Sequence, residues 1–277
     1  MKFQYLGTAA WEGIPALFCH CDVCRKSRAA GGRALRTRTQ AIIDDSLLID
    51  FPPDTYAHTL RFGIDLLHVT DCLITHTHED HWYVEDFGTL APGFGYPDAG
   101  YCLTVHGAAP VGALMRTLLD GALGQSGRCV FAEVQPFVPF AAGKYTVTPL
   151  PAIHDPKSGP LFYLISDGEK TILYAHDTHY FSNDVWAYLE REKPHIDLAS
   201  LDCTNADKPM NYVGHMGFAE NLRVRDRLVQ IGCADANTQF VSNHFSHNGG
   251  HAFYDEFVPI AAREGFLVSY DGMTVTV

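Results

Sequence analysis

The sequence predicts a layered α/β fold, and three observations support this prediction. Short apolar runs typical of strands alternate with longer stretches that have helical spacing, and the apolar residues are numerous enough for a large core. The chain has 277 residues, of which 47% are hydrophobic. It can therefore bury a sizeable core without splitting into separately folding halves, and we expect one domain over residues 1–277.

Strand-like runs occur along the whole chain. They lie at Lys2–Leu6, Gln40–Ile43, Leu47–Asp50, Cys72–Thr75, Leu103–His106, Tyr145–Leu150, Leu161–Ile165, Thr171–Ala175, Ile196–Leu201, Phe240–Asn243, Leu267–Tyr270 and Met273–Val277. Helical spacing is found at Val111–Leu123, Asp184–Glu192, Phe218–Ile231 and Ala252–Glu264. This mixture favours a layered α/β fold over an all-β sandwich or a helical bundle. Ala91–Gly100 is rich in Pro, Gly and aromatic residues, so we expect a loop, either a lid or a plain surface connection.

The charge of the chain disfavours long nucleic acids as partners. Twenty basic residues stand against 32 acidic ones, and the formal net charge is −12, which opposes binding of a long polyanion. No run approaches the roughly 18 to 20 apolar residues that cross a bilayer, and Met1–Leu6 leads into a strand pattern without a signal-peptide core. We therefore expect a cytoplasmic protein with no membrane partner. A homodimer is compatible with the sequence.

The polar run His76–His81 is the strongest functional signal. It reads His-Thr-His-Glu-Asp-His and directly follows the apolar run Cys72–Thr75, so its side chains should stand at the end of a strand. His76 and His78 project to one side of an extended backbone, and the turn brings Asp80 and His81 round to a second position. Three His and one Asp in six residues are rare in a solvated loop, which is the other interpretation. The pattern predicts a centre with two metal ions.

This run resembles the His-X-His-X-Asp-His signature of the metallo-β-lactamase superfamily. That family's further ligands are a lone His, a bridging Asp and a final His, each after a strand. Here His154 follows Leu150–Ile153, Asp177 follows Ile172–His176, and His244 follows Phe240–Asn243. The resemblance implies one metal on His76, His78 and His154, a second on Asp80, His81 and His244, and Asp177 between them. It also implies a four-layer αβ/βα sandwich. His106, His176 and His179 have no place in the family's ligand set.

A second cluster contains three of the eight cysteines, Cys19, Cys21 and Cys24. A disulfide between Cys19 and Cys21 would be strained by so short a loop, whereas three thiolates on a tight turn suit zinc. Three reduced cysteines without a ligand are the alternative. The other five lie singly in apolar runs and are typical of small buried residues: Cys72, Cys102, Cys129, Cys203 and Cys233.

The fourth ligand of such a structural zinc must come from elsewhere in the chain. The segment from Leu6 through Pro15 to the cysteines, with a His three places after the last catalytic ligand, resembles the phosphodiesterase of the carbon–phosphorus lyase pathway, a branch of the superfamily. The resemblance implies His247 as the fourth ligand. His20 and His251 are the competing candidates.

The same branch, together with tRNase Z, implies a reaction. Two divalent cations, Zn or Mn, would lower the pKa of a shared water and supply hydroxide near neutral pH. His215, just before the helical run at Phe218, corresponds to the family's catalytic His and would act as general acid. The start of that helix would offer N–H groups to a phosphate. Asp202 would orient His215, and Asp80 belongs to both the ligand set and the catalytic set.

A small phosphodiester, cyclic ones included, is the expected substrate. The chain lacks the long basic arm with which tRNase Z grips tRNA. Trp82–Asp86 replaces the small residues usual after the signature, which indicates either an aromatic wall near the metals or simple packing. Two other functions stay open. One is oxidative, by resemblance to the B protein of pyrroloquinoline quinone biosynthesis, which shares the cysteine cluster, and the other is metal-dependent binding without catalysis.

Overall fold

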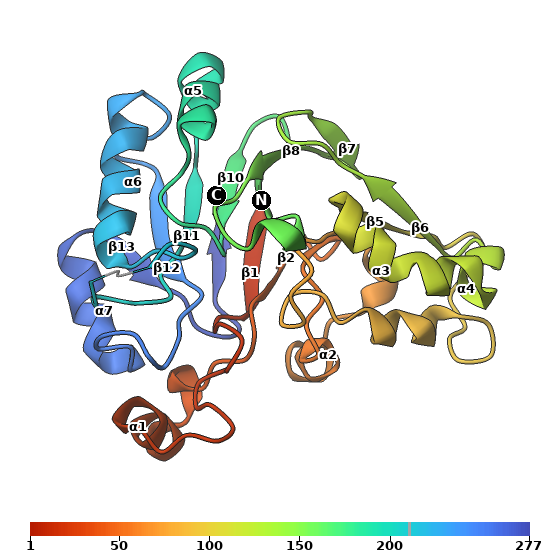
Figure 1. Cartoon of the computed structure of the whole chain (residues 1–277), viewed down its shortest axis with the longest axis horizontal. Coiled ribbons are helices and arrows are strands. Elements are labelled where there is room, and N and C mark those ends of the chain that lie inside the picture. Colours follow the sequence, from red (N-terminus) through yellow and green to blue (C-terminus); the bar gives the residue numbers. More distant parts are fainter. Residues whose placement is uncertain (210–211) are drawn as a thin grey trace.

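Two mixed β-sheets of seven strands each lie face to face in the computed structural model, which describes residues 1–209 and 212–277 (Figure 1). Helices cover the outer face of each sheet. No helix in these described ranges is long and apolar enough to cross a membrane.

The first sheet joins the two ends of the chain. The last strand pairs antiparallel with the first, and Met1 N donates to Val277 O at 2.9 Å. Antiparallel pairing continues to β3, and the remaining strands run parallel. In spatial order the strands are β14 (Thr274–Thr276), β1 (Lys2–Gly7), β2 (Gln40–Ile43), β3 (Leu47–Ile49), β4 (Asp71–Leu73), β5 (Leu103–Gly107) and β6 (Cys129–Glu133).

The second sheet has an antiparallel half and a parallel half. Its spatial order is β13 (Phe266–Val268), β12 (Gln239–Asn243), β11 (Leu198–Asp202), β10 (Thr171–Ala175), β9 (Leu161–Ser166), β8 (Tyr145–Pro151) and β7 (Phe140–Ala142). The strands from β10 to β13 are parallel, and those from β7 to β10 are antiparallel. The carboxyl ends of β10, β11 and β12 therefore meet at one edge, which is where the candidate site lies.

The helices divide between the two outer faces. The first sheet carries α3 (Ala109–Asp120) and α4 (Ala122–Gln125), and the second carries α5 (Asn183–Glu192), α6 (Phe218–Gln230) and α7 (Tyr254–Arg263) (Figure 1). Two more helices, α1 (Asp22–Ala30) and α2 (Thr55–Phe62), lie towards the bottom of the view. The 3₁₀ turns are η1 (Gly32–Ala34), η2 (Leu66–His68), η3 (Val84–Leu90) and η4 (Pro156–Ser158).

Side-chain alternation along the strands explains the four layers. On β9, Leu161, Tyr163 and Ile165 belong to the apolar layer between the two sheets, whereas Phe162 and Leu164 pack with the cluster formed with α5, α6 and α7. The same alternation sends Leu48 and Cys72 outward, into a third cluster with α3. A strand buried on both faces must be apolar at successive positions, which accounts for the uninterrupted apolar runs in the sequence.

The layered α/β prediction is confirmed, and each predicted strand run overlaps an observed strand. The predicted helix at Val111–Leu123 is divided at Gly121 into α3 and α4. Ala91–Gly100 is a loop, as expected. Among the described strands and α-helices, two strands, β6 and β7, and two helices, α1 and α2, were not predicted.

Candidate metal centre

The predicted ligands stand where strands of both sheets end. His76–His81 follows β4 of the first sheet, while His154 follows β8 and Asp177 follows β10 of the second. His244 directly follows β12, and Asp202 is the last residue of β11. Strand ends hold loop residues on a rigid support, and this is how residues far apart in sequence converge here.

The first group contains His76, His78 and His154, whose ligand atoms all lie within 4.8 Å of one another. His154 Nδ1 lies 2.9 Å from the carbonyl oxygen of Gly214, to which it can donate. With Nδ1 protonated, His154 Nε2 keeps its lone pair free for a metal ion. This nitrogen lies 3.1 Å from His78 Nδ1. Three imidazoles thus face one point, as a metal ion requires.

The second group contains Asp80, His81 and His244, again within 4.8 Å. Asp177 lies between the groups: its Oδ2 is 2.9 Å from His81 Nε2 and 2.8 Å from His244 Nε2, and its Oδ1 is 3.6 Å from His154 Nε2. The structure therefore brings together all seven residues that the sequence put forward, with Asp177 in the position of a bridge.

The ligand atoms fit divalent cations. Four ligand atoms are buried and make no well-aligned hydrogen bond within the described residues: His76 Nε2, His81 Nε2, His244 Nε2 and Asp177 Oδ2. The short distances from Asp177 Oδ2 to His81 Nε2 and His244 Nε2 bring ligand atoms together without such a bond. Buried polar atoms are normally paired, because leaving one unpaired costs about 1–3 kcal/mol. Although burial disfavours a charged imidazole, the carboxylates of Asp177, Asp80 and Asp50 hold the pKa of His81 well above its usual range. Burial lowers the pKa of His76 and of His154, which favours the neutral imidazole that binds a metal. The N and O donors of the centre suit zinc or manganese.

Asp50 is a functional residue that the sequence did not single out. Its Oδ2 accepts from His81 Nδ1 at 2.7 Å, and its Oδ1 accepts from the backbone N–H and hydroxyl of Thr75. A carboxylate on the far nitrogen fixes the tautomer of a ligating His and raises its basicity. The available signal was its place at the end of β3, next to β4 in the same sheet.

Three residues of the site have left-handed backbone conformations: Asp50 (φ 64°), Asp177 (φ 49°) and His244 (φ 62°). Such conformations are uncommon outside glycine, and they persist where the surrounding structure enforces them. All three lie at strand ends, where the turn directs the side chain into the centre.

A histidine–aspartate pair lies beside the metal ligands. Asp202 is fully buried, and its Oδ2 accepts from His215 Nδ1 at 2.9 Å and from the backbone N–H of Asp177 at 2.9 Å. Burial disfavours the charged form of His215, but Asp202 outweighs this and raises its pKa to about 9. The Thr204 hydroxyl, also missed from sequence, contacts Nδ1 of both His215 and His244.

A cavity of about 780 Å³ opens onto this centre. It is lined by Ala10, Trp11, Glu12, Thr77, His78, Glu79, Asp80, His154, Asp177, Thr204, Asn205, Lys208, Pro209, Tyr212, His215, His244, Ser246 and Asn248. This volume lies within the range of about 300–1,000 Å³ that is typical of sites for small organic ligands.

The structure decides between the two interpretations of Trp82 in favour of packing, and it places the start of α6 outside the cavity lining. Trp82 forms no aromatic wall: it is 2% exposed and packs on Phe87, so it belongs to the core. At the start of α6, Gly217 N donates to Glu220 and Phe218 N donates to Ala206 O. No residue of α6 is among those that line the cavity. Trp11 and Tyr212 supply the aromatic lining instead.

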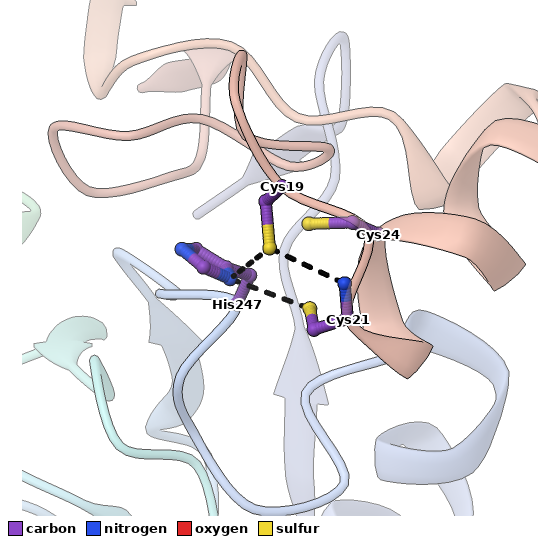
Figure 2. Close-up of side chains that lie close together, drawn as sticks. All are labelled: Cys19, Cys21, Cys24 and His247. Atoms are coloured by element: carbon purple, nitrogen blue, oxygen red, sulfur yellow. Dashed lines mark hydrogen bonds between the residues drawn. The ribbon is translucent and has the colours of Figure 1, made fainter.

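The cysteine cluster forms a separate site (Figure 2). The ligand atoms of Cys19, Cys21, Cys24 and His247 lie within 4.8 Å of one another, and His247 Nδ1 is 3.5 Å from the sulfurs of both Cys19 and Cys21. Three thiols and one imidazole suit tetrahedral zinc. His20 is exposed and His251 pairs with Asp207 at 2.7 Å, so the geometry favours His247 as the fourth ligand.

The three histidines that have no place in the family's ligand set have structural partners. His106 bonds Asp71 at 2.8 Å, and His176 bonds Ser200 at 2.8 Å. His179 Nδ1 contacts the carbonyl oxygen of His215 at 2.7 Å, which supports the loop that carries His215. None of them joins a candidate metal cluster within residues 1–209 and 212–277.

Comparison with known families agrees with this geometry. The model of the β-lactamase superfamily domain matches residues 46–230, about two thirds of the chain. The chain belongs to the metallo-β-lactamase superfamily. The resemblance inferred from His76–His81 is therefore confirmed, and so is the sandwich fold. Members of this superfamily are metal-dependent proteins, and hydrolases are common among them.

Solved structures share this superfamily's fold over nearly the whole chain. A diphosphatase of the PhnP family superposes with a TM-score of 0.73 at 19% identity, covering 99% of this chain and 97% of the other. Zinc-bound PqqB from Methylobacterium extorquens superposes with a TM-score of 0.69 at 17% identity, covering 100% of both chains. Human tRNase Z, short form, superposes with a TM-score of 0.65 at 14% identity, covering 100% of this chain and 99% of the other. At these identities the likeness establishes the fold alone.

One curated relative matches a short segment. An octanoyltransferase from Porphyromonas gingivalis (strain ATCC BAA-308 / W83) is 40% identical over 85 residues. The match covers 29% of this chain and 16% of that protein.

Proposed function

We propose that the protein is a metal-dependent phosphodiesterase that acts on small phosphodiesters, cyclic ones included. The observation that carries the proposal is the His215–Asp202 pair, with its 2.9 Å contact, in a cavity that also exposes Asp80, Asp177 and His154. Metal ligands alone suit many hydrolases, whereas a positioned proton donor suits a reaction that releases an alkoxide.

Two divalent cations would be held by the seven converging residues: His76, His78 and His154 on one side, Asp80, His81 and His244 on the other, and Asp177 between them. When bound, such ions make a coordinated water acidic and neutralise charge on the substrate. One zinc ion would be held by Cys19, Cys21, Cys24 and His247 and would support the loop structurally.

The chain's own residues supply the proton. Asp202 accepts from His215 Nδ1 and, against the effect of burial, raises the pKa of this imidazole to about 9. The ring is therefore an imidazolium near neutral pH, and its other nitrogen, Nε2, carries the transferable proton. His215 gives that proton to the leaving oxygen as the P–O bond breaks, and the Asp202 carboxylate keeps the ring in one orientation. This division of roles makes Asp202 a positioning residue and His215 the general acid.

A small anionic substrate would depend on Lys208 together with the two divalent cations. Among the described residues, four carboxylates line the cavity, Glu12, Glu79, Asp80 and Asp177, against one lysine side chain. Lys208 lines the cavity, and its ammonium group lies 3.3 Å from the Asn248 carbonyl oxygen, which occupies one of its three protons. The overall charge of −12 opposes a long polyanion. The relatives described as a diphosphatase and a tRNase Z support phosphorus–oxygen chemistry in this fold.

A substrate panel tests the proposal. The protein is loaded with Zn²⁺ or Mn²⁺ and offered bis(p-nitrophenyl) phosphate, p-nitrophenyl phosphate and an octanoyl thioester, the last because of the octanoyltransferase match. We expect the diester to be turned over fastest and chelation to abolish turnover. Preference for the thioester would contradict the proposal. Redox-active iron in the freshly purified centre would instead favour oxidative chemistry like that suggested by the likeness to PqqB.

A further inference from the structure

Trp11 is an exposed aromatic residue at the mouth of the metal cavity. Its side chain is 64% exposed, although it lines the cavity beside Glu12. Tryptophan offers a large planar surface that is usually buried or used in recognition. A bound substrate could therefore cover the indole of Trp11.

The backbone around Trp11 is fixed to the loop that carries the last metal ligand. Ala9 forms a bridge with Phe245, and Ala10 N donates to Phe245 O at 3.0 Å. Arg38 Nε donates to the carbonyl oxygen of Trp11 at 3.0 Å. Phe245 directly follows His244, so the backbone of Trp11 stands at a set place relative to the metal centre.

Glu12 adds a second clamp. Its Oε1 accepts from Ser246 Oγ and from Asn248 Nδ2, each at 3.1 Å, and it lies 3.8 Å from His247 Nε2. Glu12 thus connects the segment that precedes the three cysteines to the loop that carries His247. A recognition group on a rigid support loses little entropy on binding, and Trp11 meets that requirement.

Tyr212 provides a second aromatic face near the proton donor. It is 47% exposed, its hydroxyl accepts from Asn205 Nδ2 at 3.4 Å, and its ring centroid lies 6.1 Å from that of His215. Two π-faces from different loops thus line the same cavity as the general acid.

We propose that the substrates carry a planar nucleobase that stacks on Trp11, with Tyr212 contributing a second apolar face. This proposal rests on the phosphodiesterase function and narrows its substrate class to nucleotides rather than simple sugar phosphates. Nucleobases stack on aromatic side chains regardless of base identity, whereas a base-free sugar phosphate has no π-face to cover the indole. A quaternary ammonium head group would also bind aromatic faces, and the carboxylates of Glu12 and Glu79 line the cavity as well as Lys208. A choline diester is therefore the competing ligand in the test.

Matched substrates test the proposal on the metal-loaded full chain. Adenosine 2′,3′-cyclic phosphate and glycerol 1,2-cyclic phosphate share a five-membered cyclic diester and differ in the base. We expect kcat/KM for the nucleotide to exceed that for glycerol cyclic phosphate by at least about ten-fold. Trp11→Ala should reduce this ratio by about ten-fold, mainly through KM, and Trp11→Phe should restore much of it.

Phe18→Ala is the matched control, since Phe18 is an exposed aromatic residue of the same loop outside the cavity lining. It should leave the ratio unchanged. Equal losses for both substrates in Trp11→Ala would show a purely structural role and overturn the proposal. Preferred turnover of glycerophosphocholine would overturn it in favour of a cationic head group.

Binding separates this proposal from the phosphodiesterase function. Calorimetric titration of adenosine 3′-monophosphate and glycerol phosphate into the metal-loaded protein needs no turnover. Tighter binding of the nucleotide, lost in Trp11→Ala, supports the stacking site even if no diester is hydrolysed. Equal binding of the two ligands rejects it even if phosphodiesters are hydrolysed.

Discussion

At the scale of single residues, the centre depends on partners that hold the ligands as much as on the ligands. Asp50 bonds His81, Thr204 contacts His244, and Gly214 accepts from His154. Each contact occupies the ring nitrogen that faces away from the centre. The sequence motif identifies the ligands because their spacing is local, but it cannot show Asp50, whose bond to His81 spans 31 residues.

Asp50→Asn should weaken the metal centre by about 10- to 100-fold in metal affinity, because the amide cannot accept as a carboxylate does and His81 becomes less basic. Competition with a chromogenic chelator measures this. Asp45→Asn is the control, since Asp45 lies in the turn before β3, is exposed and pairs with Lys2 at 3.2 Å. Unchanged affinity in Asp50→Asn would show that His81 does not depend on Asp50.

Lys208→Gln should raise KM for anionic diesters several-fold with little change in kcat, and the effect should shrink at high salt because exposed charges are screened. Steady-state kinetics at two ionic strengths measures this. Arg263→Gln removes an equal charge from the end of α7, outside the cavity lining, and should have little effect. An equal rise of KM in both variants would show that only the net charge of the protein affects KM, and it would contradict a direct contact between Lys208 and the substrate.

At the scale of elements, strands and helices that bury many apolar side chains could be predicted from the sequence, and those that bury few could not. Strands with apolar side chains on both faces, such as β4 and β9, stood out in the sequence. The edge strands β6 and β7 were missed because only Cys129 and Ala142, respectively, are buried in them. Helix α1 buries only Cys24 and Ser27, and α2 buries Thr55 and His58, so neither shows an apolar stripe.

The N-terminal loop and α1 should depend on the cysteine cluster. Cys21→Ser should remove one zinc per chain while leaving the metals of the other centre in place, and should lower the Tm by several degrees, since a structural metal stabilises the fold it binds. Turnover should also fall, because this loop positions Trp11. Metal analysis and thermal unfolding measure these effects.

Cys102→Ser is the matched control for this loop, as Cys102 is a half-buried free cysteine outside the cluster. Its zinc content should equal that of the wild type. Full zinc content in Cys21→Ser would contradict the assignment of Cys21 as a ligand.

At the scale of the whole molecule, the two sheets must stay in register for the ligands to meet. His76–His81 comes from the first sheet, while Asp177 and His244 come from the second, and the apolar layer between the sheets sets their separation. Stability of that layer is therefore a condition for metal binding.

Leu198→Ala should lower the free energy of unfolding by about 2–5 kcal/mol, because Leu198 is fully buried in the layer between the sheets. Leu60→Ala, on α2 with 69% of the side chain exposed, should cost much less. Urea unfolding of the metal-loaded variants measures both. Equal losses would contradict the central position of this layer.

The central claim is that bound metals and His215 together cleave small phosphodiesters. Its most direct test is the leaving-group dependence of turnover by metal-loaded wild type, His215→Ala and the exposed control His68→Ala, with metal content measured on the same samples. We predict that His215→Ala keeps its metals. Its kcat on adenosine 2′,3′-cyclic phosphate should fall by at least about 100-fold, because the leaving alkoxide of this substrate needs a proton. Its kcat on bis(p-nitrophenyl) phosphate should fall far less, because the leaving nitrophenolate does not need one. Equal losses on both substrates, or no turnover by metal-loaded wild type, would contradict it.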